Sequence, residues 1–260
     1  FKMITLDNVS ISYGKSIVIK NLNAKIEDGS KWFIIGPNGS GKSTFLKSLI
    51  GLVNYKGTIK INGSDLRSVK KINTSTNVKE AVNISSYLTV SEFIKFHTEI
   101  RGYEYSKAIN MLEELKMSEI LHFKIGKLST GQEKMAYNIA AIATNSDLVI
   151  LDEPFETVDP WRVEILSNII KENVKSYIIV SHIIDNLSIS KIFNDTLLLI
   201  FFRGNIFGPI GKIEDSINLY VKIGSSNNSI LNYETDMGEI SILRDKEEGS
   251  VPLYKMGDIL

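Results

Sequence analysis

The residues best suited to chemistry lie in a glycine-rich loop, Gly36-Pro-Asn-Gly-Ser-Gly-Lys-Ser43. Its glycines let the backbone curl so that several N–H groups point at phosphate oxygens, and a helix that starts after the loop adds its positive end. Lys42 supplies a positive charge for the outer phosphates of a nucleotide, and the Ser43 hydroxyl can reach Mg²⁺. A glycine turn beside a lysine is the alternative. The loop predicts nucleotide binding by Gly36, Asn38, Gly39, Ser40, Gly41, Lys42, Ser43 and Thr44.

Two adjacent carboxylates provide the other half of such a site. The run Leu148-Val-Ile-Leu-Asp152-Glu153-Pro154 is apolar until it reaches Asp152 and Glu153. Successive side chains of a strand point to opposite faces, so the two carboxylates can have different roles. Asp152 can hold the metal ion, while Glu153 polarises the attacking water as a general base. Alone, the pair could be an acidic turn after a buried strand. Together with a phosphate loop, it favours a catalytic site.

These residues must be positioned by short β-branched runs that alternate with helical patterns, which is typical of an α/β protein with a largely parallel sheet. Residues 31–35 are expected to form a buried strand that ends at the loop, and residues 43–52 the helix that follows it. Residues 148–151 and 177–180 do not alternate polar and apolar side chains, which predicts buried parallel strands. Residues 3–35 are rich in expected strands.

The rest of the chain divides into a helical part and a less regular end. Residues 88–120 carry apolar side chains at helical spacing and are expected to form a helical insert between two α/β parts. The pattern weakens after about residue 211, where residues 219–223 and 240–243 could be strands separated by the polar loop 224–229. No internal repeat is visible.

Composition limits the classes of partner. The 260 residues include 30 Lys and Arg and 30 Asp and Glu, so no net charge draws the chain to nucleic acid, and no nucleic-acid partner is expected. The absence of cysteine excludes disulfides and thiolate metal sites. The most apolar run, residues 197–202, is far shorter than the roughly 20 residues that span a bilayer. Membrane association would therefore require a partner.

Further motifs, in a fixed order along the chain, resemble the nucleotide-binding subunits of ABC (ATP-binding cassette) transporters over roughly residues 3–210. The phosphate loop and following residue match the Walker A motif of this family, and the strand ending at Asp152 matches Walker B. Leu128-Ser-Thr-Gly131-Gln132 is similar to the family signature, Leu-Ser-Gly-Gly-Gln. Glu156-Thr-Val-Asp159-Pro160 is similar to the D-loop, and Ser181-His182 to the H-switch. The signature separates this family from other proteins with a phosphate loop.

The resemblance implies roles for residues whose individual signals are weak. Tyr13 would stack on adenine, and His182 would position the γ-phosphate. Ser129, Gly131 and Gln132 would cap the γ-phosphate of ATP bound to an opposite subunit, although Ser129 or Thr130 could simply cap a helix. Asp159 would belong to the D-loop. The implied catalytic residues are Glu153, His182 and Lys42, and the implied Mg²⁺ ligands are Ser43, Asp152 and Glu80.

The resemblance also implies a fold and domain boundaries. The expected fold is an α/β P-loop NTPase (RecA-like) core with a parallel-sheet centre, an N-terminal antiparallel β region and a helical insert. The core would comprise residues 1–87 and 136–210, and the helical subdomain with the signature residues 88–135. Residues 211–260 would form a small accessory region.

The sequence departs from the family pattern in the loop before the helical insert. A glutamine usually precedes the Leu-Thr-Val motif, here Leu88-Thr-Val90, but counting back leads to Glu80 and no glutamine is nearby. A carboxylate there could still ligate Mg²⁺ or orient water, while adding negative charge. In the signature, Thr130 replaces a glycine, and Glu133 follows where the family is often more basic. Neither departure removes a group that hydrolysis needs.

The function implied by the resemblance is ATP hydrolysis with Mg²⁺ in a transporter subunit. Such a subunit would form a homodimer, or a heterodimer with a second ABC ATPase, and would bind transmembrane permease subunits. It would then be cytoplasmic and peripheral on the inner face of the cell membrane. The short single cassette, Glu80, the altered signature and the C-terminal residues 252–260 favour an exporter. The alternatives are an importer ATPase, a soluble assembly ATPase without a transport role, and a binding module that has lost hydrolysis.

Overall fold

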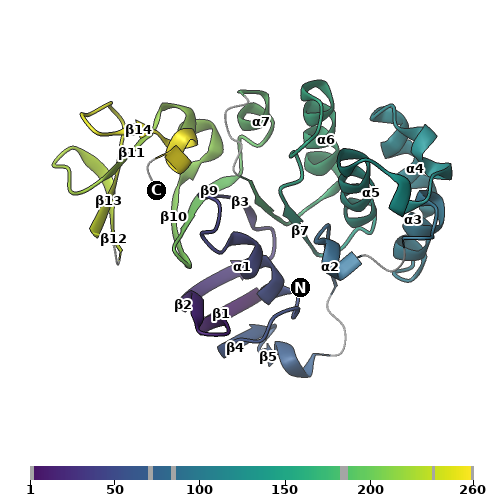
Figure 1. Ribbon diagram of the computed structural model, residues 1–260, viewed down its shortest axis with the longest axis horizontal. Helices are drawn as coiled ribbons and strands as arrows, with labels where there is room; N and C mark the ends of the chain where they lie inside the picture. Colours follow the sequence, from purple (N-terminus) through teal and green to yellow (C-terminus); the bar gives the residue numbers. More distant parts are fainter. Residues whose placement is uncertain (1–2, 70–72, 83–85, 182–186, 236–237, 259–260) are drawn as a thin grey trace.

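The apolar runs expected to be buried strands lie side by side in one six-stranded sheet (Figure 1). The computed structural model describes residues 3–258 except 70–72, 83–85, 182–186 and 236–237. The sheet contains β3 (Lys31–Ile35), β6 (Thr74–Thr76), β7 (Leu148–Asp152), β8 (Tyr177–Val180), β9 (Leu197–Phe202) and β10 (Asn205–Lys212), in the order β10-β9-β3-β8-β7-β6. The predicted strands at 31–35, 148–151 and 177–180 are confirmed.

The direction of pairing brings the functional motifs to one edge of this sheet. Only β9 and β10 pair antiparallel, whereas all other neighbouring strands are parallel. Parallel strands end at the same edge, so the loop after β3 and the carboxylates after β7 are separated by β8 alone. Both faces are covered, because Phe33 belongs to one apolar cluster and its neighbour Ile34 to the other.

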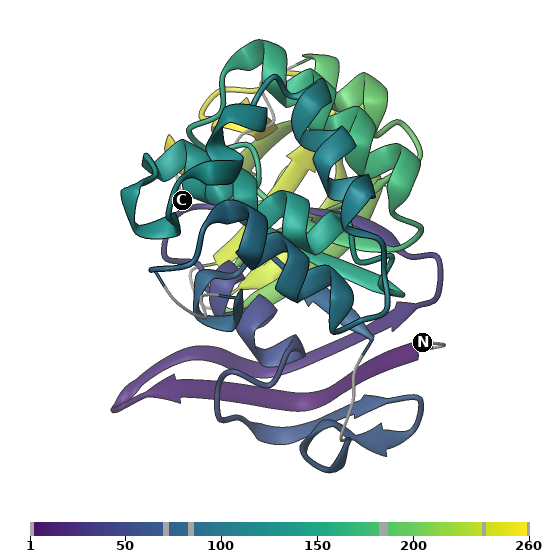
Figure 2. The ribbon, with the colours of Figure 1, turned by 90° about the vertical axis from the view of Figure 1, so that its right-hand side faces the viewer.

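A second sheet, formed by the N-terminal strands, covers one side of the phosphate-loop helix (Figure 2). Its strands are β1 (Met3–Tyr13), β2 (Ser16–Glu27), β4 (Lys56–Ile61) and β5 (Ser64–Asp65), in the order β2-β1-β4-β5. All pairs are antiparallel. Phe45, Leu46 and Leu49 fill the space between this sheet and the central sheet. The expected fold, an α/β P-loop core with an N-terminal antiparallel region, is confirmed.

The helix after the phosphate loop is shorter than the sequence pattern predicted. α1 covers Lys42–Leu49 instead of residues 43–52. Gly51 has a φ of 74°, in the left-handed region that commonly ends helices. The N–H of Leu52 then donates to the carbonyl oxygen of Lys47 over 2.9 Å, which closes the last turn. The apolar spacing at residues 50 and 52 therefore extended the prediction beyond the true end.

Helices gather at one end of the molecule (Figures 1 and 2). Thr89 and Glu92 form a capping box that starts α3, and the face of α3 that carries Phe93 packs in the main apolar cluster. α5 crosses the expected domain boundary between residues 135 and 136. The helices are α2 (Lys79–Val82), α3 (Val90–Glu99), α4 (Tyr105–Glu114), α5 (Thr130–Ile142), α6 (Pro160–Asn173) and α7 (Leu187–Ile192), with short 3-10 segments η1 (Leu66–Ser68), η2 (Ser118–His122) and η3 (Ile125–Lys127). Within the described part of the chain, no helix is both long enough and apolar enough to cross a bilayer.

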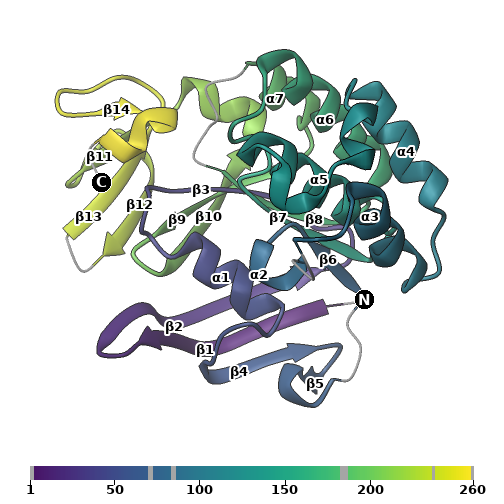
Figure 3. The same cartoon turned by 45° about the vertical axis from the view of Figure 1, so that its right-hand side comes forward.

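The C-terminal region forms a third sheet, at the opposite end from α3 and α4 (Figure 3). Its strands are β11 (Tyr220–Ile223), β12 (Ser229–Thr235), β13 (Gly238–Leu243) and β14 (Val251–Pro252), all paired antiparallel, with η4 (Ile213–Asn218) and η5 (Leu253–Asp258) beside them. The strands predicted near 219–223 and 240–243 are confirmed. Val221, Ile242 and Leu253 join the same apolar cluster as Leu198 of β9, so this sheet is packed onto the core.

Candidate functional site

The phosphate loop is shaped by backbone that only glycine accommodates easily. Gly39 and Gly41 have φ angles of 78° and 108°. A Cβ on Gly36 would lie 2.1 Å from the carbonyl oxygen of Phe201, so β9 closes the space behind the loop. Lys42 Nζ donates to the carbonyl oxygens of Gly36 and Pro37 over 2.8 and 2.9 Å. The lysine is thus held inside the loop, where its ammonium group can exchange these contacts for phosphate oxygens.

The charge of Lys42 is balanced by the carboxylates across the site. Lys42 is buried, and burial lowers its pKa, while Glu153 and Asp152 oppose that shift through their negative charges. Burial likewise raises the pKa of Asp152, and a hydrogen bond from Ser43 opposes this change. The ends of β3 and β7 therefore meet in one electrostatic environment, as the sequence predicted for Ser43 and Asp152.

The oxygen atoms at this meeting point fit a magnesium ion. Asp152 Oδ1 is buried and has no hydrogen-bond partner within the described structure. A buried carboxylate oxygen without a partner is costly, and a hard cation would satisfy it. Mg²⁺ prefers oxygen ligands, commonly one or two protein oxygens together with nucleotide phosphates. The Asp152 carboxylate and the nearby Ser43 hydroxyl are therefore a suitable set of donors.

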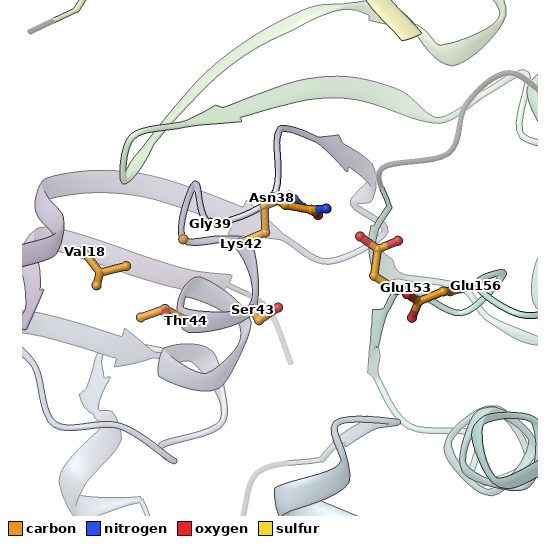
Figure 4. A pocket seen from close by; sticks show the side chains of 9 residues that line it. Val18, Asn38, Gly39, Lys42, Ser43, Thr44, Glu153 and Glu156 are labelled. Atoms are coloured by element: carbon orange, nitrogen blue, oxygen red, sulfur yellow. The ribbon is translucent and has the colours of Figure 1, made fainter. Parts of the chain in front are cut away.

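Glu153 faces the phosphate loop across an open cavity (Figure 4). Its φ of 47° lies in the left-handed region, which is uncommon for residues other than glycine and is often found at functional sites. Its N–H donates to the carbonyl oxygen of Val180 over 2.8 Å. The cavity has a volume of about 440 Å³ and is lined by Val18, Asn38, Gly39, Gly41, Lys42, Ser43, Thr44, Glu153 and Glu156.

Glu80 lies beside this cavity, but its carboxylate is engaged elsewhere. Lys47 Nζ donates to Glu80 Oε1 over 2.6 Å, and this hydrogen bond lowers the pKa of Glu80. The side chain of Asn77, which follows β6, contacts the Walker B segment by bonding to the main chain of Asp152. The sequence analysis missed Asn77. The observation that could have pointed to Asn77 is its position directly after an edge strand of the parallel sheet, at the same edge as the phosphate loop.

The signature residues lie apart from the phosphate loop. Ser129 Oγ accepts from the N–H of Gln132, and the Ser129 N–H donates to Gln132 Oε1, so the two residues form a capping box at the start of α5. This is the helix-cap arrangement that the sequence left open. A separate cavity of about 280 Å³ is lined by Ser129, Gly131 and Gln132 together with Asp159, Arg162 and others. The structure thus groups Asp159 with the signature, whereas the phosphate loop lines another cavity.

Two further residues of the expected site are less tied to it. Tyr13 is the last residue of β1, and its exposed fraction is 51%. It is not among the residues that line the phosphate-loop cavity, although Val18 of the following strand is. His182 lies outside the described residues. Val18 was not predicted, because it carries no motif signal, and Glu156 was placed only in the D-loop motif and not at the phosphate-loop cavity.

The family model described as "ABC transporter" matches residues 19–156, which is more than half of the chain. The chain belongs to the ABC transporter family. This ABC ATPase hydrolyses ATP to power transport. It is similar to the zinc uptake system ATP-binding protein ZurA of Listeria innocua, with 32% identity over 70% of the chain and 77% of the relative. It is also similar to the manganese transport system ATP-binding protein MntB of Halalkalibacterium halodurans, with 29% identity over 76% of the chain and 82% of the relative.

Solved structures agree with the family assignment. A crystal structure of a proposed cobalt transport ATP-binding protein matches the ABC ATPase with a TM-score of 0.83 and 33% identity, covering 94% of this chain and 93% of that chain. A bacterial ABC transporter cassette solved as a dimer has a TM-score of 0.65 and 22% identity, covering 79% of this chain and 97% of that chain. The second match supports the fold alone.

Proposed function

We propose that this ABC ATPase energises the uptake of a divalent transition-metal cation through a separate transmembrane partner. The observation that supports it best is the set of relatives, whose names describe zinc uptake and manganese transport. The structure of a proposed cobalt transport protein, at 33% identity, belongs to the same chemical class of cargo. None of these names supports the export direction expected from the sequence. A solved exporter is 19% identical and shares only the fold. The importer alternative is therefore the better hypothesis.

The proposed chemistry is attack of water on the γ-phosphate of ATP. Lys42 would bind the outer phosphates, and the N–H groups of the phosphate loop would surround them. Ser43 and Asp152 would hold Mg²⁺, which supplies positive charge to the phosphates when bound. Glu153 would accept the proton of the water as general base. Glu80 lines a neighbouring cavity with Ser43 and Asp152, but its ion pair with Lys47 favours a structural role over metal binding.

The complete site is proposed to need two subunits. Ser129, Gly131 and Gln132 lie in a cavity that does not include the phosphate loop, so they would act on nucleotide bound to an opposite subunit. The exposed signature sequence at the start of a helix suits contact with a γ-phosphate. A homodimer and a heterodimer with a second ABC ATPase both satisfy this geometry. Tyr13 at the adenine and His182 at the γ-phosphate remain predictions from the family resemblance.

The partner is proposed to be a transmembrane permease that docks beside the helical part. A cavity of about 280 Å³ lies between the core and α3, lined partly by Ala81, Val82, His97 and Arg101. Apolar side chains close to it in the sequence are exposed: Phe96 of α3 at 44%, Ile100 directly after α3 at 64%, and Tyr87 before α3 at 80%. Such apolar surface is typical of protein interaction sites. Membrane association of this ABC ATPase would then arise through the permease.

Metal uptake by cells that carry or lack this chain tests the proposal. Deletion should lower the uptake of radiolabelled Mn²⁺, Zn²⁺ or Co²⁺, and the unaltered chain should restore it. A chain with Lys42→Met should not restore it, because an uncharged side chain cannot bind the outer phosphates of ATP as the lysine would. Unchanged uptake of all three ions after deletion, with increased retention of another compound, would support export instead. Isolation of the chain with a multi-span membrane protein would identify the permease.

A further inference from the structure

Two buried asparagines join the signature helix to the end of β6. Asn77 follows β6 and Asn138 lies within α5, with exposed fractions of 6% and 0%. Asn77 Nδ2 donates to Asn138 Oδ1 over 2.7 Å. A buried amide is unfavourable unless its remaining donors and acceptors also find partners. The identity of those partners indicates what the pair does.

The remaining partners are main-chain atoms on both sides of Glu153. Asn77 Oδ1 accepts from the N–H of Asp152 over 2.7 Å, and Asn77 Nδ2 also donates to the Asp152 carbonyl oxygen over 3.1 Å. Asn138 Nδ2 donates to the carbonyl oxygen of Pro154 over 2.9 Å. The two amides therefore hold residues 152 and 154, while Glu153 lies between them. Each polar atom of the two side chains has a partner, as a well-formed buried network requires.

Glu153 needs such support because its backbone conformation is unfavourable. Its φ of 47° is one that a non-glycine residue keeps only when its surroundings impose it. The hydrogen bond from its N–H to Val180 fixes the core side of the segment. The asparagine pair fixes the side that faces α5. Together these contacts set the direction in which the Glu153 carboxylate leaves the strand.

The same face of α5 makes two more contacts with the loop after Glu153. Gly131, Lys134 and Asn138 follow helical spacing and share this face. Lys134 Nζ lies 2.5 Å from Glu156 Oε2, and a Cβ on Gly131 would lie 2.8 Å from the Thr157 carbonyl oxygen. α5 therefore contacts residues 154, 156 and 157 of this loop, and the contact of Asn138, at Pro154, is the one directly beside Glu153.

We propose that Asn138, acting through Asn77 and the main chain of residues 152–154, is a positioning residue for ATP hydrolysis in its own subunit. The inference rests on the proposed roles of Asp152 and Glu153. Ser129, which caps the start of α5, is proposed to contact the nucleotide of the opposite subunit. A movement of α5 on that contact would therefore reach the general base of the first subunit through Asn138. In a dimer, the hydrogen-bonded pair of Asn77 and Asn138 (the asparagine bridge) would connect the signature residues of a subunit, which contact the opposite nucleotide, to the nucleotide site of its own subunit.

The test compares Asn138→Leu with a matched control, Ser75→Ala. Leucine keeps the branched shape and the number of heavy atoms of asparagine but removes both hydrogen bonds. Ser75 Oγ donates to the Ala141 carbonyl oxygen over 2.8 Å, so the control also removes a buried hydrogen bond between the β6 strand and α5. The control does not change the hydrogen bonds to the main chain of residues 152–154. Each variant is assayed for kcat and KM of ATP hydrolysis, for ATP-binding stoichiometry, and for hydrogen exchange in a peptide that covers residues 148–156.

Asn138→Leu should lower kcat per bound nucleotide by about tenfold to a hundredfold, as expected for a misplaced catalytic group, with little change in KM. It should also speed hydrogen exchange at the main-chain N–H groups of Asp152 and Glu153, and Ser75→Ala should do neither. Equal effects of the two variants, or a normal kcat in folded Asn138→Leu, would overturn the proposal. If Asn138→Leu fails to fold, Asn138→Asp provides the test, because it keeps the acceptor for Asn77 and loses the donor to Pro154. Normal hydrolysis by Glu153→Gln would instead contradict the proposed general base.

Discussion

The Nζ atom of Lys47 lies 2.6 Å from Oε1 of Glu80, which ties the phosphate-loop helix α1 to the short helix α2. The hydrogen bond is the main reason that the pKa of Glu80 is lowered and that of Lys47 is raised. Glu80 is 59% exposed on its side chain, so solvent screens the pair. The carboxylate expected to replace a glutamine near Mg²⁺ is thus used in a surface ion pair between two helices.

Glu80→Gln should leave catalysis largely intact. We expect ATP hydrolysis within about threefold of the unaltered chain and the same Mg²⁺ concentration for half-maximal rate, because Ser43 and Asp152 remain. The free energy of unfolding should fall by less than about 1 kcal/mol, as for other exposed ion pairs. A Mg²⁺ titration of the hydrolysis rate checks this. A large increase in the required Mg²⁺ would show that Glu80 is a metal ligand.

Gly131→Ala should displace the loop that follows Glu153, residues 154–159, because the added Cβ would lie 2.8 Å from the Thr157 carbonyl oxygen. Thr157 has a φ of 60°, so its backbone is already in an unfavourable conformation and cannot easily move away from the added methyl group. We expect ATP hydrolysis to fall by about tenfold or more. Thr130→Ala, at the exposed neighbouring position, is the control and should hydrolyse ATP normally. Equal rates for both variants would contradict the importance of this close contact.

Asp195 should make stability depend on pH in the acid range. Burial raises the pKa of Asp195, but hydrogen bonds from Lys171 and Lys31 lower it more strongly, to about 2. A carboxyl group whose folded pKa is lowered stabilises the fold above its unfolded pKa of about 3.9, and loses this contribution as pH falls towards 2. Asp195→Asn should therefore lower the free energy of unfolding at pH 7, by no more than about 1 kcal/mol because the side chain is 43% exposed.

Urea titrations at pH 7 and near the folded pKa measure this effect. The difference between Asp195→Asn and the unaltered chain should shrink as pH falls from about 4 towards 2. Asp28→Asn, which removes a solvent-exposed pair with Lys175, is the control and should have the smaller effect at pH 7. A difference that grows on acidification would mean that the two lysines do not hold Asp195 in its charged form.

Much of the fold could be predicted because it depends on local pattern. Residues 32–35 and 177–180 form short apolar runs, and both lie in strands of the central sheet. The end of α1 was predicted too late, because apolar spacing outweighed the stop signal of Gly51. The C-terminal strands were visible in the pattern, but their packing onto the core depends on contacts that no local pattern contains.

The site was predictable where glycines and charges follow a fixed spacing. Lys42, Ser43, Asp152 and Glu153 are such residues, and the fold brings them to one edge of the sheet. The asparagine bridge could not be predicted in this way. Asn77 and Asn138 are 61 residues apart, and a single asparagine in either element has no pattern that names its partner. Only the packing of α5 against β6 and β7 makes them a pair.

Sedimentation of Glu153→Gln with and without ATP and Mg²⁺ tests the two-subunit ATPase site most directly. Glutamine cannot accept the proton of the attacking water, but it leaves Lys42, Ser43 and the signature residues in place. We expect hydrolysis to be nearly abolished, while ATP with Mg²⁺ converts the chain into a stable dimer. The same dimer should not form when Lys42→Met is added. Normal ATP turnover by Glu153→Gln, or a monomer at saturating ATP and Mg²⁺, would contradict this mechanism.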